Sequence, residues 1–543
     1  MKQIEILDCT LRDGGRVIDC RYPDETIIGL GKHLKRAGIN IIEMGFLRDD
    51  AVFAGNSTFF SSPADCDVYI EQICENESRQ NEKYVVFVDF GLYDVNCLEE
   101  AEKVRVSGIR FGFTKKDYME HKRQVVEAMQ TVKRKGYELY LQTVNSNGYT
   151  TAELLELIEL ANFISPKSFG IVDTYGSMYL DDLEYMWSIV NRHLDKHIAV
   201  DFHSHNNMQM SFALAQRMIQ LAADERRLVL DTTLNGMGKC AGNLNTELIV
   251  DYLARKKDLD YDTDVILDAI DRYLYPIKAE SEWGYSVPAF MAGLYKAHPN
   301  NVIFLTEKYR LNNKDIKYIL SGIDEAKRQR YDYDNIQRVY KEYSSCRVED
   351  SETVRRLASE ISGKEVLVLA SGKTVVDCAG RISEYVAAYR PLVISINYVP
   401  EGIKCDYYFY ANTIHWEKVS KGIDHRRCIV SSNIHTDVED VAMVEYSRLI
   451  AEDSPLFDNS TIMLLNLLNL LQPARISLAG FDGLNERKDN YVEGTCPNIV
   501  SGMDYREFNR EIAGLVRRYR NKTRGKIEVQ FLTPSKYDVG EAI

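Results

Sequence analysis

The stretch IEILDCTLRDGGRVIDCRYPDETIIGLGKHLKRAGINIIEMG, residues 4–45, contains one complete strand-helix-strand unit. Its first run, IEILD (4–8), is apolar and ends at turn residues, which is typical of a buried strand. DETIIGLGKHLKRAG (24–38) has the spacing of an amphipathic helix, and INIIEMG (39–45) is a second buried strand. Two buried strands joined by a helix predict a parallel β/α/β unit.

The same alternation continues through the first half of the chain. Six further apolar runs, with helix-like segments between them, bring the number of predicted strands to eight: 84–90, 106–112, 138–144, 168–173, 198–205 and 228–234. Eight β/α units in about 255 residues match the size of a TIM barrel. We therefore expect a TIM (β/α)8 barrel over residues 1–260.

The second half has a different pattern. Residues 261–345 are mostly helical in character and become charge-dense, which predicts a helical extension followed by a linker. Six apolar runs then recur within residues 346–543: 365–371, 392–398, 405–411, 427–432, 475–483 and 527–532. This second alternation predicts a smaller, Rossmann-like α/β domain.

Composition limits the classes of partner. The 543 residues include 67 Lys plus Arg against 81 Asp plus Glu, a net charge of -14 that argues against nucleic-acid binding. The sequence shows neither a signal peptide nor an apolar run long enough to span a membrane. The 11 cysteines include no C-x-x-C pair, which favours reduced thiols. We expect a cytoplasmic protein without membrane contact.

Polar residues follow the predicted barrel strands at one end. Arg12 and Asp13 follow the first strand, His203 and His205 end the seventh, and Asn243 lies in a glycine-rich loop after the eighth. Two histidines two apart on a strand point to the same face, so both can reach one ion. An isolated H-x-H is more often a pair of ordinary strand-end residues. The joint placement of these residues favours a two-histidine, one-carboxylate site for a divalent metal.

These segments also resemble a family, the DRE-TIM metallolyases, which includes 4-hydroxy-2-oxoacid aldolases, hydroxymethylglutaryl-CoA lyase and isopropylmalate synthase. The matching motifs are LDCTLRDGG (7–15), IEMGF (42–46), DTYGSM (173–178), DFHSHNN (201–207) and GMGKCAGNLNTE (236–247). The resemblance implies that Asp13, His203 and His205 bind the metal, with Asn243 as a further ligand or a group beside it. It also implies that Arg12 is the catalytic cation, that the ion is Mn²⁺ or Mg²⁺, with Zn²⁺ as an alternative, and that the protein is a homodimer.

The chemistry implied is carbon-carbon bond cleavage or formation in a 4-hydroxy-2-oxo acid, with pyruvate as the enolate half and an aldehyde as the other. An enolate needs a fixed positive partner, which Arg12 and the ion would supply. Glu43 would orient the guanidinium or form an ion pair without a catalytic part, and Thr174 would contact substrate. The alternatives are a Claisen-type acyl-CoA lyase or synthase, and a degenerate barrel fused to a nucleotide-binding module.

One departure from the family leaves the general base open. The aromatic-degradation aldolases carry a histidine three positions after the metal aspartate, where this chain has Arg16. Tyr285, His298 and a metal-bound water are the candidates for the base. Arg16 would instead bind an anionic substrate group, a carboxylate or a phosphate.

The second domain carries ASGKT (370–374) between a predicted strand and a predicted helix. Backbone amides of Ser371, Gly372 and Lys373 could hold a phosphate at that helix start, although the segment is not a Walker A loop. The domain loosely resembles modules of polysaccharide-biosynthesis glycosyltransferases and pterin diphosphokinase-like proteins. That resemblance implies a nucleotide or nucleotide-sugar ligand.

Overall fold

The computed structural model describes residues 4–74, 82–223, 225–307, 311, 313–344, 348–451, 453–485, 491–492 and 504–538. By their internal contacts the residues form two compact units. The first comprises residues 1–302 with 328–330, and the second 303–327 with 331–543. The boundary lies inside the segment 261–345, which is helical.

The first unit is a parallel barrel, as predicted. Among the described residues, eight strands pair side by side in chain order, and β1 closes the ring by pairing with both β2 and β9. A short extra strand, β3, pairs with the end of β2. The strands are β1 (Ile4–Asp8), β2 (Ile41–Leu47), β3 (Phe59–Phe60), β4 (Lys83–Asp89), β5 (Gly108–Phe113), β6 (Glu138–Thr143), β7 (Ser168–Asp173), β8 (Ala199–Ser204) and β9 (Leu228–Thr232).

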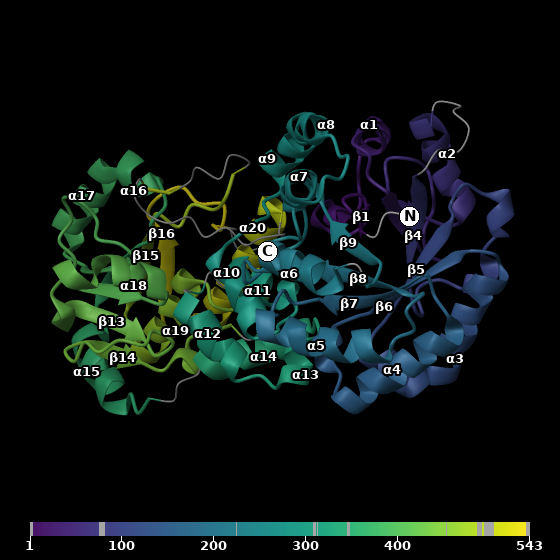
Figure 1. Cartoon of the computed structure of the whole chain (residues 1–543). Helices are drawn as coiled ribbons and strands as arrows, with labels where there is room; N and C mark the ends of the chain where they lie inside the picture. The colour runs from purple at the N-terminus through teal and green to yellow at the C-terminus, as the bar shows by residue number, and fades with distance from the viewer. Residues whose placement is uncertain are drawn as a thin grey trace. The chain divides into compact units, whose positions relative to one another are not determined.

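Helices surround this barrel and continue beyond it (Figure 1). Those around the barrel are α1 (Asp24–Arg36), α2 (Pro63–Cys74), α3 (Lys115–Arg134), α4 (Thr151–Ile164), α5 (Leu180–His193), α6 (Ser211–Ala222) and α7 (Thr246–Lys257). Those that follow are α8 (Thr263–Ala269), α9 (Tyr275–Glu280), α10 (Val287–Leu294), α11 (Pro299–Glu307), α12 (Asn313–Ser321), α13 (Glu325–Arg328) and α14 (Tyr333–Ser344). None of the described helices combines the length and the apolar composition needed to cross a lipid bilayer.

Strand pleating divides the barrel residues between two environments. Alternate residues face the helices and form the large core, for example Ile6, Ile42 and Val86. The residues between them point into the barrel and form an apolar layer there: Leu7, Cys9, Ile41, Val85, Tyr140, Ala199 and Val229. Because side chains repeat every two residues, the next inward positions toward the carboxyl ends are 43, 87, 142, 201 and 231.

The second unit contains an open parallel sheet, a separate α/β domain, as predicted. Its order is β14-β13-β12-β11-β10-β15-β16. The strands are β10 (Glu365–Leu369), β11 (Leu392–Ile396), β12 (Tyr407–Tyr410), β13 (Cys428–Ser431), β14 (Ala442–Val444), β15 (Arg475–Ala479) and β16 (Glu528–Phe531). Sequence reasoning missed β14, because three residues are too few to show a strand pattern.

Helices cover both faces of this sheet. Val366 and Val368 of β10 pack in the same core as α15 (Ser351–Ile361), α19 (Ser460–Leu471) and α20 (Tyr505–Thr523). Leu367 and Leu369 face the opposite way, toward α17 (Ala379–Tyr389). Two shorter helices, α16 (Thr374–Asp377) and α18 (Thr413–Val419), follow β10 and β12.

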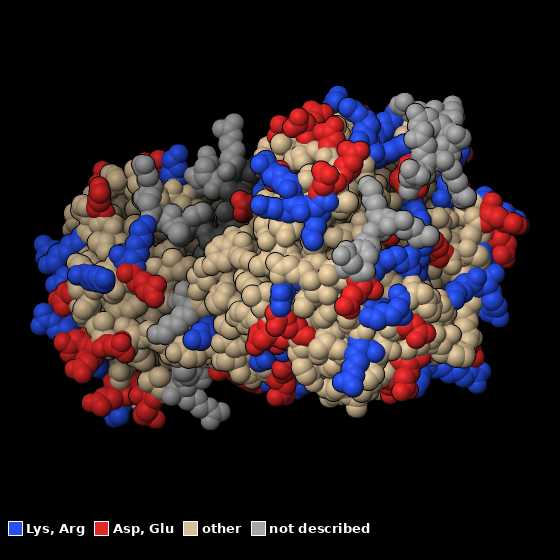
Figure 2. All heavy atoms as spheres, in the orientation of Figure 1, with Lys and Arg blue, Asp and Glu red and all other residues tan. Residues whose placement is uncertain are grey.

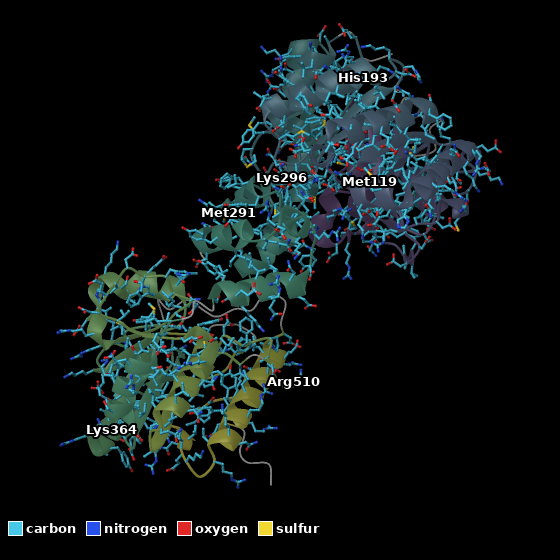
Figure 3. The ribbon with its side chains drawn as sticks, turned by 90° about the horizontal axis from the view of Figure 1, so that it is seen from below. Met119, His193, Met291, Lys296, Lys364 and Arg510 are labelled. Carbon is cyan, nitrogen blue, oxygen red and sulfur yellow. The ribbon has the colours of Figure 1, made fainter. Side chains whose placement is uncertain are left out.

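The charged side chains on the face shown in Figure 2 are of both signs and largely interleaved. Figure 3 shows the side chains from below, with His193 at the end of α5. The charges that concern the candidate site lie instead inside the barrel.

Candidate active site

The carboxyl ends of the barrel strands bring three metal-binding side chains together. One ligand atom each of Asp13, His203 and His205 lies within 4.8 Å of the other two. The two imidazole rings are 5.0 Å apart and perpendicular, and His205 Nε2 lies 3.8 Å from Asp13 Oδ2. Asp13 follows β1, His203 is on β8, and His205 lies one residue beyond β8. The spacing of these residues in the chain therefore produces a compact group in space.

The protonation states of this trio suit a cation. Burial lowers the pKa of His203 and of His205 to about 4, so both imidazoles are neutral at physiological pH. Burial would raise the pKa of Asp13, but Arg12 and the two histidines hold it well below its usual value. The group therefore offers two neutral nitrogens and one carboxylate.

Asn243 adds a further oxygen beside this trio. Its side-chain amide donates to Asp13 Oδ2 over 2.9 Å and to the carbonyl of Met237 over 3.0 Å. Its side-chain carbonyl oxygen is buried and, within the described residues, has no hydrogen-bond partner. An orphaned buried oxygen next to a carboxylate and two imidazoles fits a divalent cation.

A second group of metal-ligand types shares His203 and comprises Cys9, His203 and Asp231. Burial raises the pKa of the Cys9 thiol well above its ordinary value, and the thiol contacts the Thr232 carbonyl over 3.2 Å. A protonated thiol is a poor ligand. The Asp13 group is therefore the better candidate.

Arg12 is held rigidly at the edge of the metal-binding group. Its Nε donates to Glu43 and its Nη1 to Asp13, each over 2.7 Å, and its guanidinium lies 4.5 Å from the centre of the Phe87 ring. Burial would lower the pKa of Arg12, but Glu43 and Asp13 raise it above its ordinary value. The result is a permanent, oriented positive charge beside the candidate metal ligands.

Two other predicted substrate contacts lie near the same end of the barrel. Arg16 Nε is 3.5 Å from Asp13, its guanidinium lies 4.6 Å from the centre of the Phe46 ring, and its side chain is 43% exposed. The Thr174 hydroxyl accepts a hydrogen bond from the amide of Asn145. Arg16 thus offers a partly exposed cation, whereas Thr174 ties two loops together.

The two candidate bases differ in their surroundings. Tyr285 is 60% exposed, and no contact with the metal-binding group is seen for it within the described residues. His298 lies closer to the site: its Nδ1 accepts from the amide of Asn300, whose side chain accepts from Lys239 in the loop after β9. Burial, with Lys239 and Arg16 nearby, lowers the pKa of His298 to about 4.

Sequence reasoning missed a buried network beneath the site. Arg110, on β5, is fully buried; it donates to Glu43 over 3.0 Å and to Asp231 and contacts Asp201 over 3.5 Å. Asp231 lies 3.0 Å from His203 Nδ1. A charged residue inside the apolar strand GIRFGF was the available signal, since its parity directs it into the barrel.

This network connects the two halves of the site. Arg110 contacts Glu43, which also pairs with Arg12. It also contacts Asp231, which lies beside His203. A hydrogen bond from His203 Nδ1 to Asp231 would leave Nε2 available to bind a metal. Burial raises the pKa of Asp201 to about 7, with the charge of Asp231 adding to the effect.

In the second unit, one of the three amides of the predicted phosphate loop, that of Gly372, is hydrogen-bonded within the described residues. The Gly372 amide donates to the Gly480 carbonyl over 2.8 Å, and the Thr374 amide donates to Asp482 over 2.9 Å. The helix that follows, α16, has only four residues. Ser371 and Gly372 line a pocket, whereas Lys373 is not among its lining residues.

The fold and the site together define a class: a (β/α)8 barrel with a two-histidine, one-carboxylate group and a fixed arginine at the carboxyl ends of its strands. The family model HMGL-like matches residues 3–272, which include the whole barrel. The barrel domain is therefore similar to the HMGL-like family of DRE-TIM proteins, a match that selects no substrate.

Curated relatives share the barrel region at low identity. A 4-hydroxy-2-oxovalerate aldolase from Carboxydothermus hydrogenoformans is 25% identical over 58% of this chain and 90% of its own length. An oxaloacetate decarboxylase from Mycobacterium tuberculosis is 28% identical over 49% of this chain and 74% of its own length. A solved HMG-CoA lyase from Brucella melitensis has a TM-score of 0.41 at 17% identity, covering 51% of this chain and 99% of that one.

Proposed function

We propose that the barrel is a divalent-metal-dependent carbon-carbon lyase that cleaves or forms a 4-hydroxy-2-oxo acid through a pyruvate enolate. The observation that carries the proposal is the close group of Asp13, His203 and His205, with Arg12 locked beside it. The match to the HMGL-like family model and the aldolase relative support the same reaction class.

The ion would be held by Asp13, His203 and His205, with the Asn243 carbonyl oxygen as a further ligand. A bound Mn²⁺ or Mg²⁺, or alternatively Zn²⁺, supplies a Lewis acid that polarises the keto group of the substrate. Two histidine nitrogens are more typical ligands for Mn²⁺ or Zn²⁺ than for Mg²⁺.

The chain's own residues supply the remaining charge. Arg12 stabilises the negative oxygen that develops as the carbon-carbon bond breaks, and Glu43 keeps its guanidinium in place. The partly exposed guanidinium of Arg16 binds an anionic group of the substrate. The ion pairs that hold Arg12 and Glu43 in these positions are present in the structure.

For the general base we propose His298, because it is linked through Asn300 and Lys239 to the loop after β9 and is neutral at physiological pH. With a pKa of about 4 it is a weak base in the free protein, so a negatively charged substrate must raise that pKa for proton transfer to be efficient. Tyr285 remains the alternative. His298→Ala should lower kcat on a hydroxy substrate by roughly a hundredfold, whereas Tyr285→Phe should change it less than about threefold. The reverse ranking would assign the role to Tyr285.

A second candidate is decarboxylation of a 2-oxo dicarboxylate, which passes through the same enolate but deprotonates no hydroxyl group. Arg16 favours it, because it stands where the related aldolases carry their histidine and could hold a second carboxylate. The oxaloacetate decarboxylase relative supports this alternative.

Hydrogen exchange of pyruvate tests the shared step. The purified chain is incubated with pyruvate in D₂O with and without Mn²⁺, quenched with a chelator, and the methyl protons are followed by NMR. We expect metal-dependent exchange that Arg12→Ala abolishes and that Arg217→Ala, a partly exposed control on α6, retains. Pyruvate release from 4-hydroxy-2-oxo acids and from oxaloacetate then separates the two candidates. Reaction only with acyl-CoA substrates would contradict both.

A further inference from the structure

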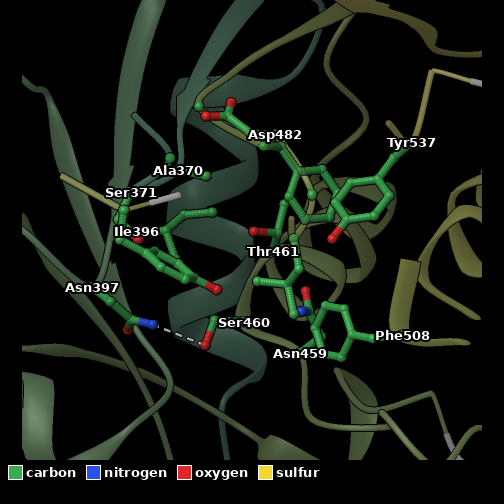
Figure 4. A pocket seen from close by; sticks show the side chains of 16 residues that line it. Ala370, Ser371, Ile396, Asn397, Asn459, Ser460, Thr461, Asp482, Phe508 and Tyr537 are labelled. Carbon is green, nitrogen blue, oxygen red and sulfur yellow. Dashed lines mark hydrogen bonds between the residues drawn. The ribbon is translucent and has the colours of Figure 1, made fainter. Parts of the chain in front are cut away.

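The second parallel sheet has a pocket where its strand order reverses. β10 lies between β11 and β15, so the chain winds in one direction through β11 to β14 and in the other through β15 and β16. In open parallel sheets, ligands bind beyond the carboxyl ends of the strands at such a point. The pocket lies there, lined by the residues that follow β10, β11 and β15 and by the start of α19 (Figure 4).

Two glycines bring the backbones after β10 and β15 into close approach. A Cβ on Gly372 would lie 2.2 Å from the Gly480 carbonyl oxygen. Gly480 has a φ of +73°, and a Cβ there would lie 2.2 Å from the Ala370 carbonyl oxygen. Only glycine fits this approach, so these backbones form one wall of the pocket without side chains.

The hydroxyl groups of two buried side chains, Thr461 and Tyr537, lie at the pocket. Thr461 is 6% exposed and Tyr537 is 3% exposed. Within the part of the chain that the structure describes, neither side-chain hydroxyl makes a hydrogen bond, and both are directed toward the same space in Figure 4. Both hydroxyl groups border the open space of the pocket, so polar atoms of a ligand would be their partners. Nearby, the Ser460 hydroxyl is fixed by a 2.9 Å hydrogen bond from Asn397.

The charge of the described lining residues argues against a phosphate as the main recognition element. Among the described residues that line it, Asp482 is the one charged side chain. Its carboxylate accepts hydrogen bonds from the amide and the hydroxyl of Thr374, so it is held beside the pocket. A phosphate would face this carboxylate, and no arginine or lysine is among the described residues that line the pocket.

The remaining walls suit a flat ring. The Phe481 and Tyr537 rings are 4.6 Å apart, and Phe508 and Ile396 contribute apolar surface. A nucleobase combines flat apolar faces with a polar edge, and its ribose carries hydroxyl groups. We propose that this pocket binds a nucleoside or the nucleoside part of a nucleotide, recognised by Thr461 and Tyr537, with any phosphate directed away from Asp482.

Calorimetry on the full chain tests the proposal. Adenosine, guanosine, cytidine and uridine are titrated separately, followed by the matching diphosphates, inorganic phosphate and glucose. We expect at least one nucleoside to bind, its diphosphate to bind within about threefold of it, and phosphate alone not to bind. Thr461→Val and Tyr537→Phe should each weaken nucleoside binding on the order of tenfold.

Tyr410→Phe is the matched control, because Tyr410 is a fully buried tyrosine of the same unit whose hydroxyl is also unpartnered, yet it does not line the pocket. It should leave the affinity unchanged. The proposal is overturned if no nucleoside binds at about 5 mM, or if glucose binds and nucleosides do not. It is also overturned if a diphosphate binds tenfold or more tightly than its nucleoside. Equal nucleoside affinity in Thr461→Val, Tyr537→Phe and Tyr410→Phe would overturn it as well. These measurements detect binding alone, so they do not depend on the barrel's proposed reaction.

Discussion

The two parallel sheets place pockets or charged groups at the carboxyl ends of their strands, but they fill those ends with opposite kinds of side chain. In the barrel, Arg12, Asp13, Glu43 and Arg110 are buried and charged. In the open sheet, the described residues that line the pocket offer hydroxyl groups, aromatic rings and one carboxylate, that of Asp482. The backbone provides the location in both, and the side chains determine which chemistry follows.

The difference follows from the closure of the first sheet into a barrel. A closed barrel directs inward residues from all its strands toward a common axis, so charges from distant parts of the chain come within contact distance and offset one another. Arg110 on β5 thereby meets carboxylates from β2, β8 and β9. The open sheet has no common axis, and its pocket depends on neighbouring strand ends and one helix start.

The largest expected effect is loss of the ion on removal of a barrel ligand. His205→Ala should lower Mn²⁺ affinity by roughly a thousandfold, because even loss of a group that only orients a metal ligand costs 10 to 100-fold. Calorimetry with Mn²⁺ measures it. His193→Ala, an exposed histidine at the end of α5, should bind Mn²⁺ as the wild type does. Equal Mn²⁺ affinity in both variants would mean that His205 does not bind the ion. The carboxyl ends of the barrel strands would then not differ from those of the open sheet in this way.

Arg110→Met should destabilise the metal-free barrel by about 3–5 kcal/mol, because it leaves three buried carboxylates without their shared cation. Arg475→Met is the matched change in the second unit, where Arg475 also contacts two carboxylates but is partly exposed. It should cost far less, because solvent screens its two ion pairs. Urea unfolding compares the variants, and similar losses would mean that burial of the network makes no difference.

Arg12→Ala should lower kcat by about 100 to 1,000-fold, the usual effect of removing a fixed positive partner of a developing oxyanion. Mn²⁺ affinity should remain close to that of the wild type, because the three ligands stay in place. Steady-state kinetics and calorimetry together separate the two effects. Near-normal rates in this variant would show that Arg12 does not stabilise the enolate.

The smallest expected effect is a flat pH dependence of metal binding. Burial lowers the pKa of His203 and His205 to about 4, so both stay unprotonated from pH 8 to 5.5, and Mn²⁺ affinity should change less than about threefold. Affinity should then fall as the pH drops through 4. Titrations at several pH values measure it, and a decline that begins near pH 6.5 would indicate imidazoles exposed to water.

Local sequence patterns predicted most of the fold. The strands IEILD (4–8) and SFGIVD (168–173) have the same bounds in the structure, and most of the others agree within one or two residues. The short strands β3 and β14 were not predicted, since in such short segments tertiary pairing outweighs local pattern. For the site, the spacing of Arg12, Asp13, His203 and His205 was sufficient to nominate the group that the structure brings together.

The sequence by itself determined the alternation of strands and helices, and with it the parity that directs His203 and His205 to one face, because these depend on residues near each other in the chain. Only the tertiary structure decided that Arg110 joins Glu43 to Asp231, and that Thr461 and Tyr537 face one pocket. Such contacts join residues dozens of positions apart, and strand closure and helix packing, which no local pattern encodes, bring them together.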